Sequence, residues 1–176
     1  MYSQSELLLS NANRIVVVGP CGSGKSTFSR ALATIRDLPV IHLDTIFWQP
    51  GWVRSPDKVW VEKQEKFIAL DRWIIDGSYA QTLPLRLARA ELVVHLDYPR
   101  WIYIARLLKR VIMSGVRIRL DMTQGCSERL DLDFLLYAWR FRDQQRPRII
   151  DAIAASSVPE LRLNHPLKAE RALQNV

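Results

Sequence analysis

The sequence predicts an α/β protein with a parallel, five-stranded sheet covered by helices on both faces. The first observation is that short apolar runs alternate with longer segments of helical spacing along the chain. The helices that connect parallel strands cover both faces of a sheet. Because such strands are buried on both faces, they are apolar throughout. The second observation is size: 176 residues, 48% of them hydrophobic, suffice for one core and are too few for two ordinary domains. We therefore expect a single domain over residues 1–176.

The elements follow one another in a regular order. Pro147 removes a backbone donor from the longest helical segment, so we expect that helix to be broken or kinked there. The first thirteen residues form a short leader without a clear pattern. Strands are predicted at 15–18, 40–43, 73–75, 91–96 and 161–163, and helices at 27–35, 56–70, 100–114, 132–155 and from Pro166 onward.

A glycine-rich loop joins the first strand to the first long helix. Residues 19–26 read G-P-C-G-S-G-K-S, the G-x-x-x-x-G-K-[ST] pattern whose backbone N–H groups and helix N-terminus bind nucleotide phosphates. We expect Lys25 to bridge the β- and γ-phosphates of ATP and the Ser26 hydroxyl to coordinate Mg²⁺. An ordinary glycine-rich turn is the alternative, but it would not require a strand and a helix on its flanks. The predicted cofactor-binding set is Gly19, Gly22, Ser23, Gly24, Lys25, Ser26 and Thr27.

Carboxylates follow two of the predicted strands, Asp44 after 40–43 and Asp76 after 73–75. Ligands of parallel sheets bind beyond the carboxyl ends of the strands, where the phosphate loop also lies. Phosphoryl transfer needs an acid near Mg²⁺ and, for an alcohol acceptor, a carboxylate that orients or deprotonates the hydroxyl. We therefore predict Asp44 as a catalytic residue on the acceptor side and Asp76 as a metal ligand. For both residues the alternative is a local turn or cap.

Two histidines and a third carboxylate are interpreted as structural. His42 and His95 lie inside predicted strands, which favours packing over catalysis. Asp97 closes another strand just before a proline, and we expect it to stabilise the fold.

The two cysteines predict no metal site. Cys21 lies inside the phosphate loop and Cys126 far from it, and a bridge between them would tie down a loop that must wrap phosphate. No apolar stretch approaches the length of a membrane span. We expect a soluble, cytoplasmic protein with reduced thiols.

Aromatic residues cluster after Asp44, at Phe47, Trp48, Trp52 and Trp60. Such rings are able to form a platform for a base or another flat acceptor, or to pack an insert onto the core. Both readings stay open. We expect residues 45–70 to form an acceptor-binding insert.

Residues 98–148 carry ten arginines and one lysine against five acids, a net charge of +6 out of +7 for the chain. Arginines favour bidentate phosphate contacts. The basic segment suits bound nucleotides or a nucleic-acid backbone, and some of its arginines belong to solvated helix faces. Within it, residues 115–130 have glycines near each end and no clear period, which predicts a lid over the phosphates. Its arginines are the remaining catalytic candidates: Arg117, Arg119 and Arg129.

Several blocks together resemble one bacterial family. They are G-P-C-G-S-G-K-S-T, H-L-D-T-I-F-W-Q-P-G-W, W-I-I-D-G-S-Y, L-D-Y-P-R and R-L-D-M-T-Q-G-C-S-E-R. The chain resembles the DNA topology modulation proteins (FlaR-like), an adenylate-kinase-like family, over about residues 14–173. The resemblance implies a P-loop NTPase of the nucleoside monophosphate kinase type: three α/β/α layers, a substrate-binding insert after the second strand and a lid. It also implies that the loop residues bind ATP and Mg²⁺, that Asp44 lies on the acceptor side, and that the three arginines belong to the lid.

One departure from adenylate kinases concerns the acceptor. Those enzymes follow their third strand with D-G-[FY]-P-R, whereas this chain has D-G-S-Y-A over residues 76–80. The arginine that would hold a monophosphate is missing from that place, which argues against AMP.

Two classes of function fit the sequence. The first is an ATP-dependent kinase for a small nucleotide, nucleoside or other hydroxyl compound. The second is an ATP-binding regulator that associates with DNA through the basic segment. A kinase acting on nucleic-acid ends would join both features. The sequence leaves the acceptor and the oligomeric state open.

Overall fold

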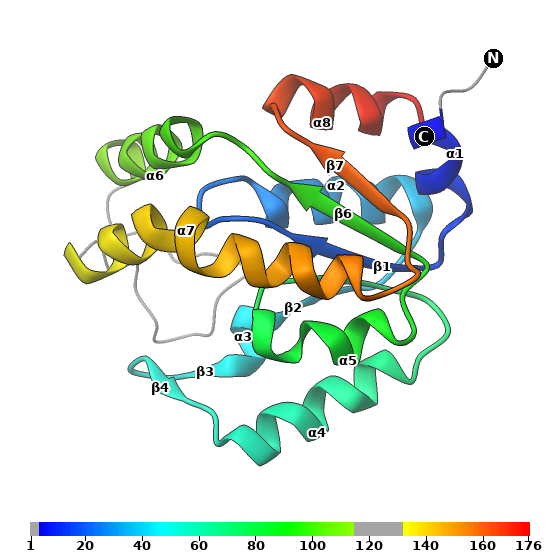
Figure 1. Ribbon diagram of the computed structural model, residues 1–176, viewed down its shortest axis with the longest axis horizontal. Helices are drawn as coiled ribbons and strands as arrows, with labels where there is room; N and C mark the ends of the chain where they lie inside the picture. Colours follow the sequence, from blue (N-terminus) through cyan, green and yellow to red (C-terminus); the bar gives the residue numbers. More distant parts are fainter. Residues whose placement is uncertain (1–3, 115–131) are drawn as a thin grey trace.

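The central sheet has five parallel strands in the order β2-β5-β1-β6-β7 (Figure 1). The computed structural model describes residues 4–114 and 132–176. Strand β1 is central: Ile15 pairs with Ile74 of β5 on one side and with Leu92 of β6 on the other. This arrangement confirms the predicted parallel sheet. The strands are β1 Arg14–Val18, β2 Val40–His42, β5 Trp73–Asp76, β6 Leu92–Leu96 and β7 Glu160–Leu163.

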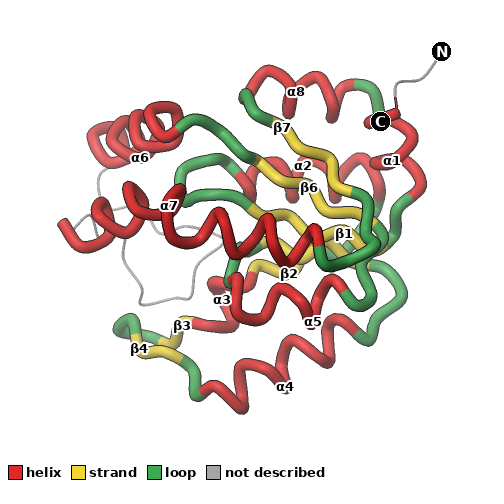
Figure 2. Tube along the Cα trace, viewed as in Figure 1, coloured by secondary structure: helices red, strands yellow, loops and turns green. Residues whose placement is uncertain are grey.

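Helices cover both faces of the sheet, which confirms the predicted three layers (Figure 2). One face packs against α1 Gln4–Asn11, α2 Lys25–Arg36, α8 Pro166–Gln174 and the start of α6 Arg100–Ser114. The other face packs against α3 Leu43–Phe47, α4 Asp57–Ile68, α5 Leu83–Leu87 and α7 Leu132–Ala154. A short hairpin, β3 Trp48–Gln49 and β4 Val53–Arg54, follows α3, and a 3₁₀ turn, Ala80–Thr82, precedes α5.

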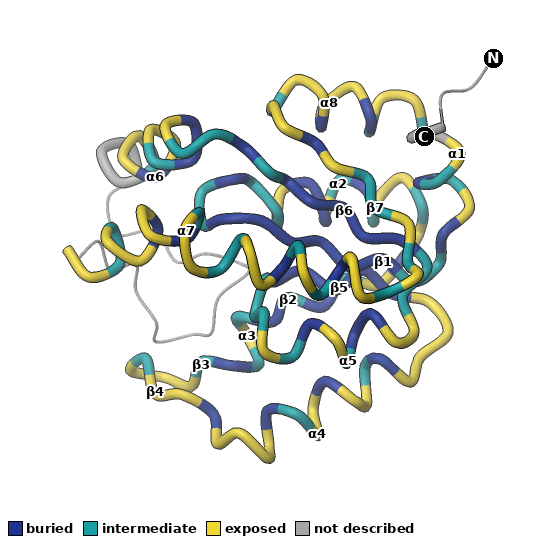
Figure 3. The backbone as a smooth tube through the Cα atoms, viewed as in Figure 1, coloured by how far each residue is buried: buried dark blue, intermediate teal, exposed yellow. Residues whose placement is uncertain are grey.

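Side-chain alternation along β1 divides the core into two halves. Ile15 and Val17 belong to the cluster under α1, α2 and α8, whereas Val16 and Val18 belong to the cluster under α3, α4, α5 and α7. All four are fully buried. Strand β1 is accordingly drawn in dark blue over most of its length in Figure 3. A strand that is apolar on both faces is what a doubly covered sheet requires.

Three local details differ from the expectations. The leader, for which the sequence showed no clear pattern, contains helix α1, which places Leu9 and Ala12 in the core. Strand β2 ends at His42, one residue before the predicted end, and Asp44 lies in the first turn of α3. Helix α7 runs through Pro147 without a break. Pro147 is exposed, so the carbonyl that it leaves unpaired faces water, while buried side chains on either side hold the helix against the sheet.

None of the described helices combines the length and the apolar character needed to cross a membrane.

Candidate nucleotide and acceptor site

The phosphate loop links β1 to α2 along a path that only glycine accommodates. Gly22 has φ 82° and Gly24 has φ 89°, the left-handed region that glycine populates without a Cβ clash. A Cβ on Gly22 would lie 2.5 Å from the carbonyl oxygen of Tyr103. Helix α6 therefore packs directly on the loop, and Gly24 is the N-cap from which α2 begins.

Two basic side chains meet the loop. The Nζ of Lys25 donates to the carbonyl oxygen of Pro20 at 3.0 Å, so the ammonium lies across the loop. Arg106 of α6 donates to the carbonyl oxygen of Ser23 at 3.4 Å. The Ser23 side chain is buried. The backbone N–H of Ser23 donates to the carbonyl oxygen of Pro20 at 3.1 Å and closes a turn. Ser26 and Thr27 follow in the first turn of α2, where the helix dipole is positive.

Asp44 lies beside a tyrosine that the sequence analysis did not single out. The hydroxyl of Tyr79 donates to Asp44 Oδ1 at 2.6 Å. Burial raises the pKa of Tyr79, and the charge of Asp44 raises it further, so the phenol stays a donor. Cys21 of the phosphate loop and Tyr137 of α7 also contribute to the raised pKa of Tyr79. Tyr79 is therefore within electrostatic reach of both Asp44 and the phosphate loop.

Asp76 is a buried member of β5, and it pairs with His42 of β2. The two atoms His42 Nδ1 and Asp76 Oδ2 are 2.8 Å apart, where an Nδ1–H donates to the carboxylate. Asp76 Oδ1 is buried without a hydrogen-bond partner among the described residues. Such an orphaned carboxylate oxygen fits a Mg²⁺ ion or one of its waters, which proteins hold through one or two carboxylates and substrate phosphates. Residues 4–114 and 132–176 contain no group of three or more His, Cys, Asp or Glu suited to a metal.

The turn after β5 is tied down by two residues that sequence reasoning missed. Ser78 Oγ accepts from the Gly19 N–H at 3.0 Å and donates to the Gly19 carbonyl at 2.6 Å. The fully buried Arg86 donates to the carbonyl oxygens of Gly77, at 2.5 Å, and of Ser78 and Tyr79, both at 3.0 Å. No periodic pattern marks either residue, so the sequence carried no signal for them.

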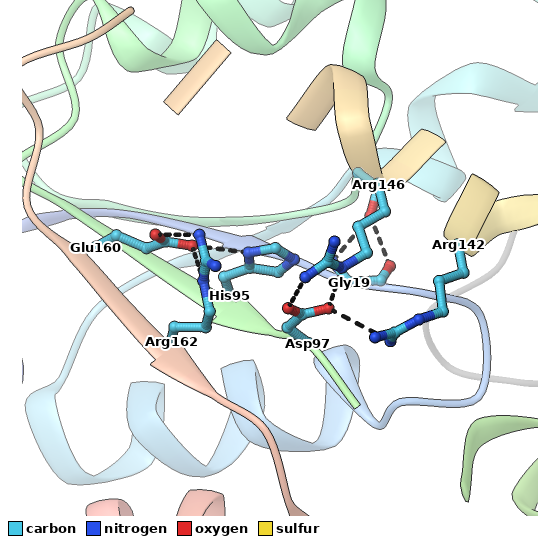
Figure 4. Close-up of polar contacts among 8 residues, drawn as sticks. Gly19, His95, Asp97, Arg142, Arg146, Glu160 and Arg162 are labelled. Carbon is cyan, nitrogen blue, oxygen red and sulfur yellow. Dashed lines mark hydrogen bonds and ion pairs between the residues drawn. The ribbon is translucent and has the colours of Figure 1, made fainter. Parts of the chain in front are cut away.

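A separate ion-pair network closes the edge of the sheet at β6 and β7 (Figure 4). Arg146 of α7 contacts both Asp97 oxygens at 2.7 Å, and Arg142 lies 3.9 Å from Asp97 Oδ1. Burial alone would raise the pKa of Asp97, but the hydrogen bonds from Arg146 and the charges of His95, Arg146 and Arg142 together outweigh burial and lower it. The buried His95 pairs with Glu160 at 2.7 Å. These contacts agree with the structural roles predicted for Asp97 and His95.

The aromatic cluster of the insert has a buried base and a half-buried rim. Phe47 and Trp60 are buried, with ring centroids 5.0 Å apart. Tyr79 contacts both, at 4.8 and 4.9 Å, and Trp48 and Trp52 extend the cluster outward. The rings therefore pack the insert onto the core, and Phe47 and Tyr79 connect the rim of Trp48 and Trp52 to Asp44.

The predicted lid at 115–130, with Arg117, Arg119 and Arg129, falls outside the described residues.

Comparison with solved structures identifies the fold. The chain aligns with shikimate kinase from Acinetobacter baumannii in complex with shikimate at a TM-score of 0.58 and 14% identity, over 96% of this chain and 93% of that one. It aligns with deoxyadenosine kinase from M. mycoides with bound dATP at a TM-score of 0.61 and 13% identity, over 91% and 95% of the two chains. The protein thus has the three-layer fold of P-loop kinases of the nucleoside monophosphate kinase type. No protein-family model and no curated protein matched the sequence.

Proposed function

We propose that the protein is an ATP-dependent kinase that transfers the γ-phosphate to a hydroxyl of a small molecule or nucleotide. The observation that carries the proposal is the hydrogen-bonded pair of Asp44 and Tyr79 at the same edge of the sheet as the phosphate loop. Ser78 joins that edge to Gly19 at the start of the loop, so donor and acceptor sides share one rigid support. The solved structures that share this fold include kinases of shikimate and of deoxyadenosine, both compounds with hydroxyl groups.

In the proposed reaction Asp44 accepts the proton of the acceptor hydroxyl. The oxygen then forms a bond to the γ-phosphorus, the bond from that phosphorus to the β–γ bridging oxygen breaks, and ADP leaves with the electron pair. Tyr79 holds one oxygen of Asp44 in place, and the Lys25 ammonium moves from the Pro20 carbonyl to the phosphates. Mg²⁺, held by Ser26 and the free oxygen of Asp76, would neutralise phosphate charge.

The resemblance to the FlaR-like family supports the same reading, because its blocks include the phosphate loop and the Asp44 segment. The alternative function, a DNA-associated regulator, needs the arginines of residues 98–148 to face an open surface. Three of them are used within the fold instead. Arg100 pairs with Asp143 at 2.8 Å, and Arg142 and Arg146 contact Asp97. These three side chains serve internal contacts instead of presenting an open basic surface.

The proposal is tested by a transfer screen with labelled ATP against nucleosides, nucleoside monophosphates, small hydroxyl compounds and oligonucleotide ends. We expect label in a small acceptor, and we expect Lys25→Ala to abolish it while the thermal midpoint stays close to wild type. Lys168→Ala, an exposed lysine of α8, is the matched control. Salt-sensitive DNA binding without transfer to any acceptor would favour the regulator instead.

A further inference from the structure

The rim of the aromatic cluster contains a strained residue. Trp52 has φ 64° at the turn of the β3–β4 hairpin, directly after Gly51 with φ 78°. A bulky side chain in the left-handed region is a genuine outlier, because its Cβ crowds the backbone. The turn of the hairpin imposes this conformation, and strained residues of this kind are found more often at functional sites than elsewhere. Here the conformation places the Trp52 ring 5.4 Å from the Trp48 ring, with the planes at 69°.

The rim is connected to Asp44, the proposed catalytic carboxylate, through two aromatic residues. Trp48 contacts Phe47 at 4.9 Å, and Phe47 contacts Tyr79, the donor to Asp44. Figure 1 shows the β3–β4 hairpin on the left, the side on which the loop between β1 and α2 also lies. A chain of ring contacts from Trp52 through Trp48 and Phe47 to Tyr79 therefore connects the rim to the hydrogen-bond partner of Asp44.

The charged residues around the aromatic cluster disfavour an acceptor that carries a phosphate. Ala80 stands where adenylate kinases have their phosphate-binding arginine, and the nearby Arg86 is fully buried on three backbone carbonyls. Asp44 instead places a carboxylate beside the aromatic cluster. Among the described residues, Arg54 is a cation at the cluster, with its guanidinium 5.2 Å from the centre of the Phe47 ring, and the test below therefore includes Arg54→Gln.

We infer that the acceptor is an uncharged nucleoside, whose base stacks on Trp52 at the Trp48–Trp52 rim and whose sugar hydroxyl meets Asp44. The inference rests on the proposed kinase function for the transfer step, but the binding of the base does not depend on turnover. Base stacking on aromatic side chains contributes enough to binding to be seen in a single substitution.

The test compares adenosine, guanosine, cytidine and thymidine with their 5′-monophosphates, by calorimetric binding and by transfer from labelled ATP. At least one nucleoside should bind and accept phosphate at least tenfold better than its monophosphate. Trp52→Gly should weaken binding of that nucleoside by about tenfold while the protein stays folded, because the strain that glycine relieves offsets the lost contact with Trp48. Trp101→Ala, an exposed tryptophan of α6, should leave the affinity unchanged.

Three results would overturn the inference. One is a preference for monophosphates that Arg54→Gln removes, which would make Arg54 a phosphate ligand. The second is transfer only to acceptors without a flat ring, which would leave the kinase proposal standing. The third is nucleoside affinity unchanged by Trp52→Gly. Nucleoside binding that is sensitive to Trp52 but unaccompanied by transfer would support the binding site and contradict the kinase function.

Discussion

The hydroxyl of Ser78 bonds both the N–H and the carbonyl of Gly19, at 3.0 and 2.6 Å, so the turn after β5 and the start of the phosphate loop form one unit. The same turn carries Tyr79, the partner of Asp44. A single side chain thereby links the turn that carries Tyr79 to the glycine-rich loop.

Ser78→Ala should lower both stability and turnover. Loss of the hydroxyl removes two hydrogen bonds and leaves the partly buried Gly19 groups unpaired, at a cost of about 2 kcal/mol. Thermal melting measures that cost, and transfer kinetics should show a fall in kcat beyond the change in folded fraction. Ser157→Ala, an exposed serine remote from the loop, is the control. A stable variant with wild-type kcat would show that the two sides are not coupled through Ser78.

Asp76→Asn should shift the Mg²⁺ dependence of the reaction. The buried Oδ1 atom without a hydrogen-bond partner is the atom that we assign to the ion or its water. Replacing the carboxylate with an amide weakens a site for a hard cation that favours charged oxygen ligands. Titration of the rate with Mg²⁺ at fixed ATP should therefore require more Mg²⁺ for half-maximal activity. An unchanged half-maximal concentration, with normal folding, would leave Asp76 as only the partner of His42.

Stability should depend on pH through Glu160. Burial alone raises the pKa of Glu160, but hydrogen bonds from His95 and Arg162 lower it from 4.5 to about 2. A carboxyl whose folded pKa lies below its ordinary value stabilises the fold above pH 4.5, and this stabilisation is lost as the pH falls from 4.5 to 2.

Glu160→Gln should therefore unfold with a shallower pH dependence between pH 4.5 and 2, followed by circular dichroism. At pH 7 the variant should lose about 2 kcal/mol, the contribution of charge-assisted hydrogen bonds. Glu62→Gln, an exposed glutamate of α4, is the matched control. Identical acid transitions for Glu160→Gln and wild type would disprove the assignment.

Replacement of the predicted lid arginines distinguishes a kinase from a DNA-associated regulator. Replacing Arg117, Arg119 and Arg129 by Ala should collapse transfer by about 10³-fold or more, because an arginine on the transferring phosphoryl contributes that much, with little loss of ATP affinity. The same preparation is assayed for DNA binding at several salt concentrations. Retained transfer together with lost DNA affinity and a reduced salt slope would instead assign the three arginines to DNA.

The sequence predicted the sheet well because β1, β5 and β6 are largely apolar runs that are buried on both faces. It predicted the glycine-rich loop between β1 and α2 because glycine, lysine and serine stand there at a fixed spacing. It could not predict Arg86 or Ser78, because their partners are backbone carbonyl and N–H groups that only the fold brings near. The end of β2 was misplaced for a related reason: Leu43 is apolar and buried, but it belongs to the first turn of α3.

The central claim is that Asp44 serves an acceptor hydroxyl in phosphoryl transfer. The most direct measurement is single-turnover transfer from labelled ATP to the accepted compound, with wild type and Asp44→Asn compared at matched ATP occupancy. Asparagine keeps an oxygen for the Tyr79 hydroxyl but cannot take a proton, so the rate should fall by about 10²-fold or more while ATP affinity and thermal midpoint hold. A folded Asp44→Asn variant that transfers phosphate at the wild-type rate would contradict the account.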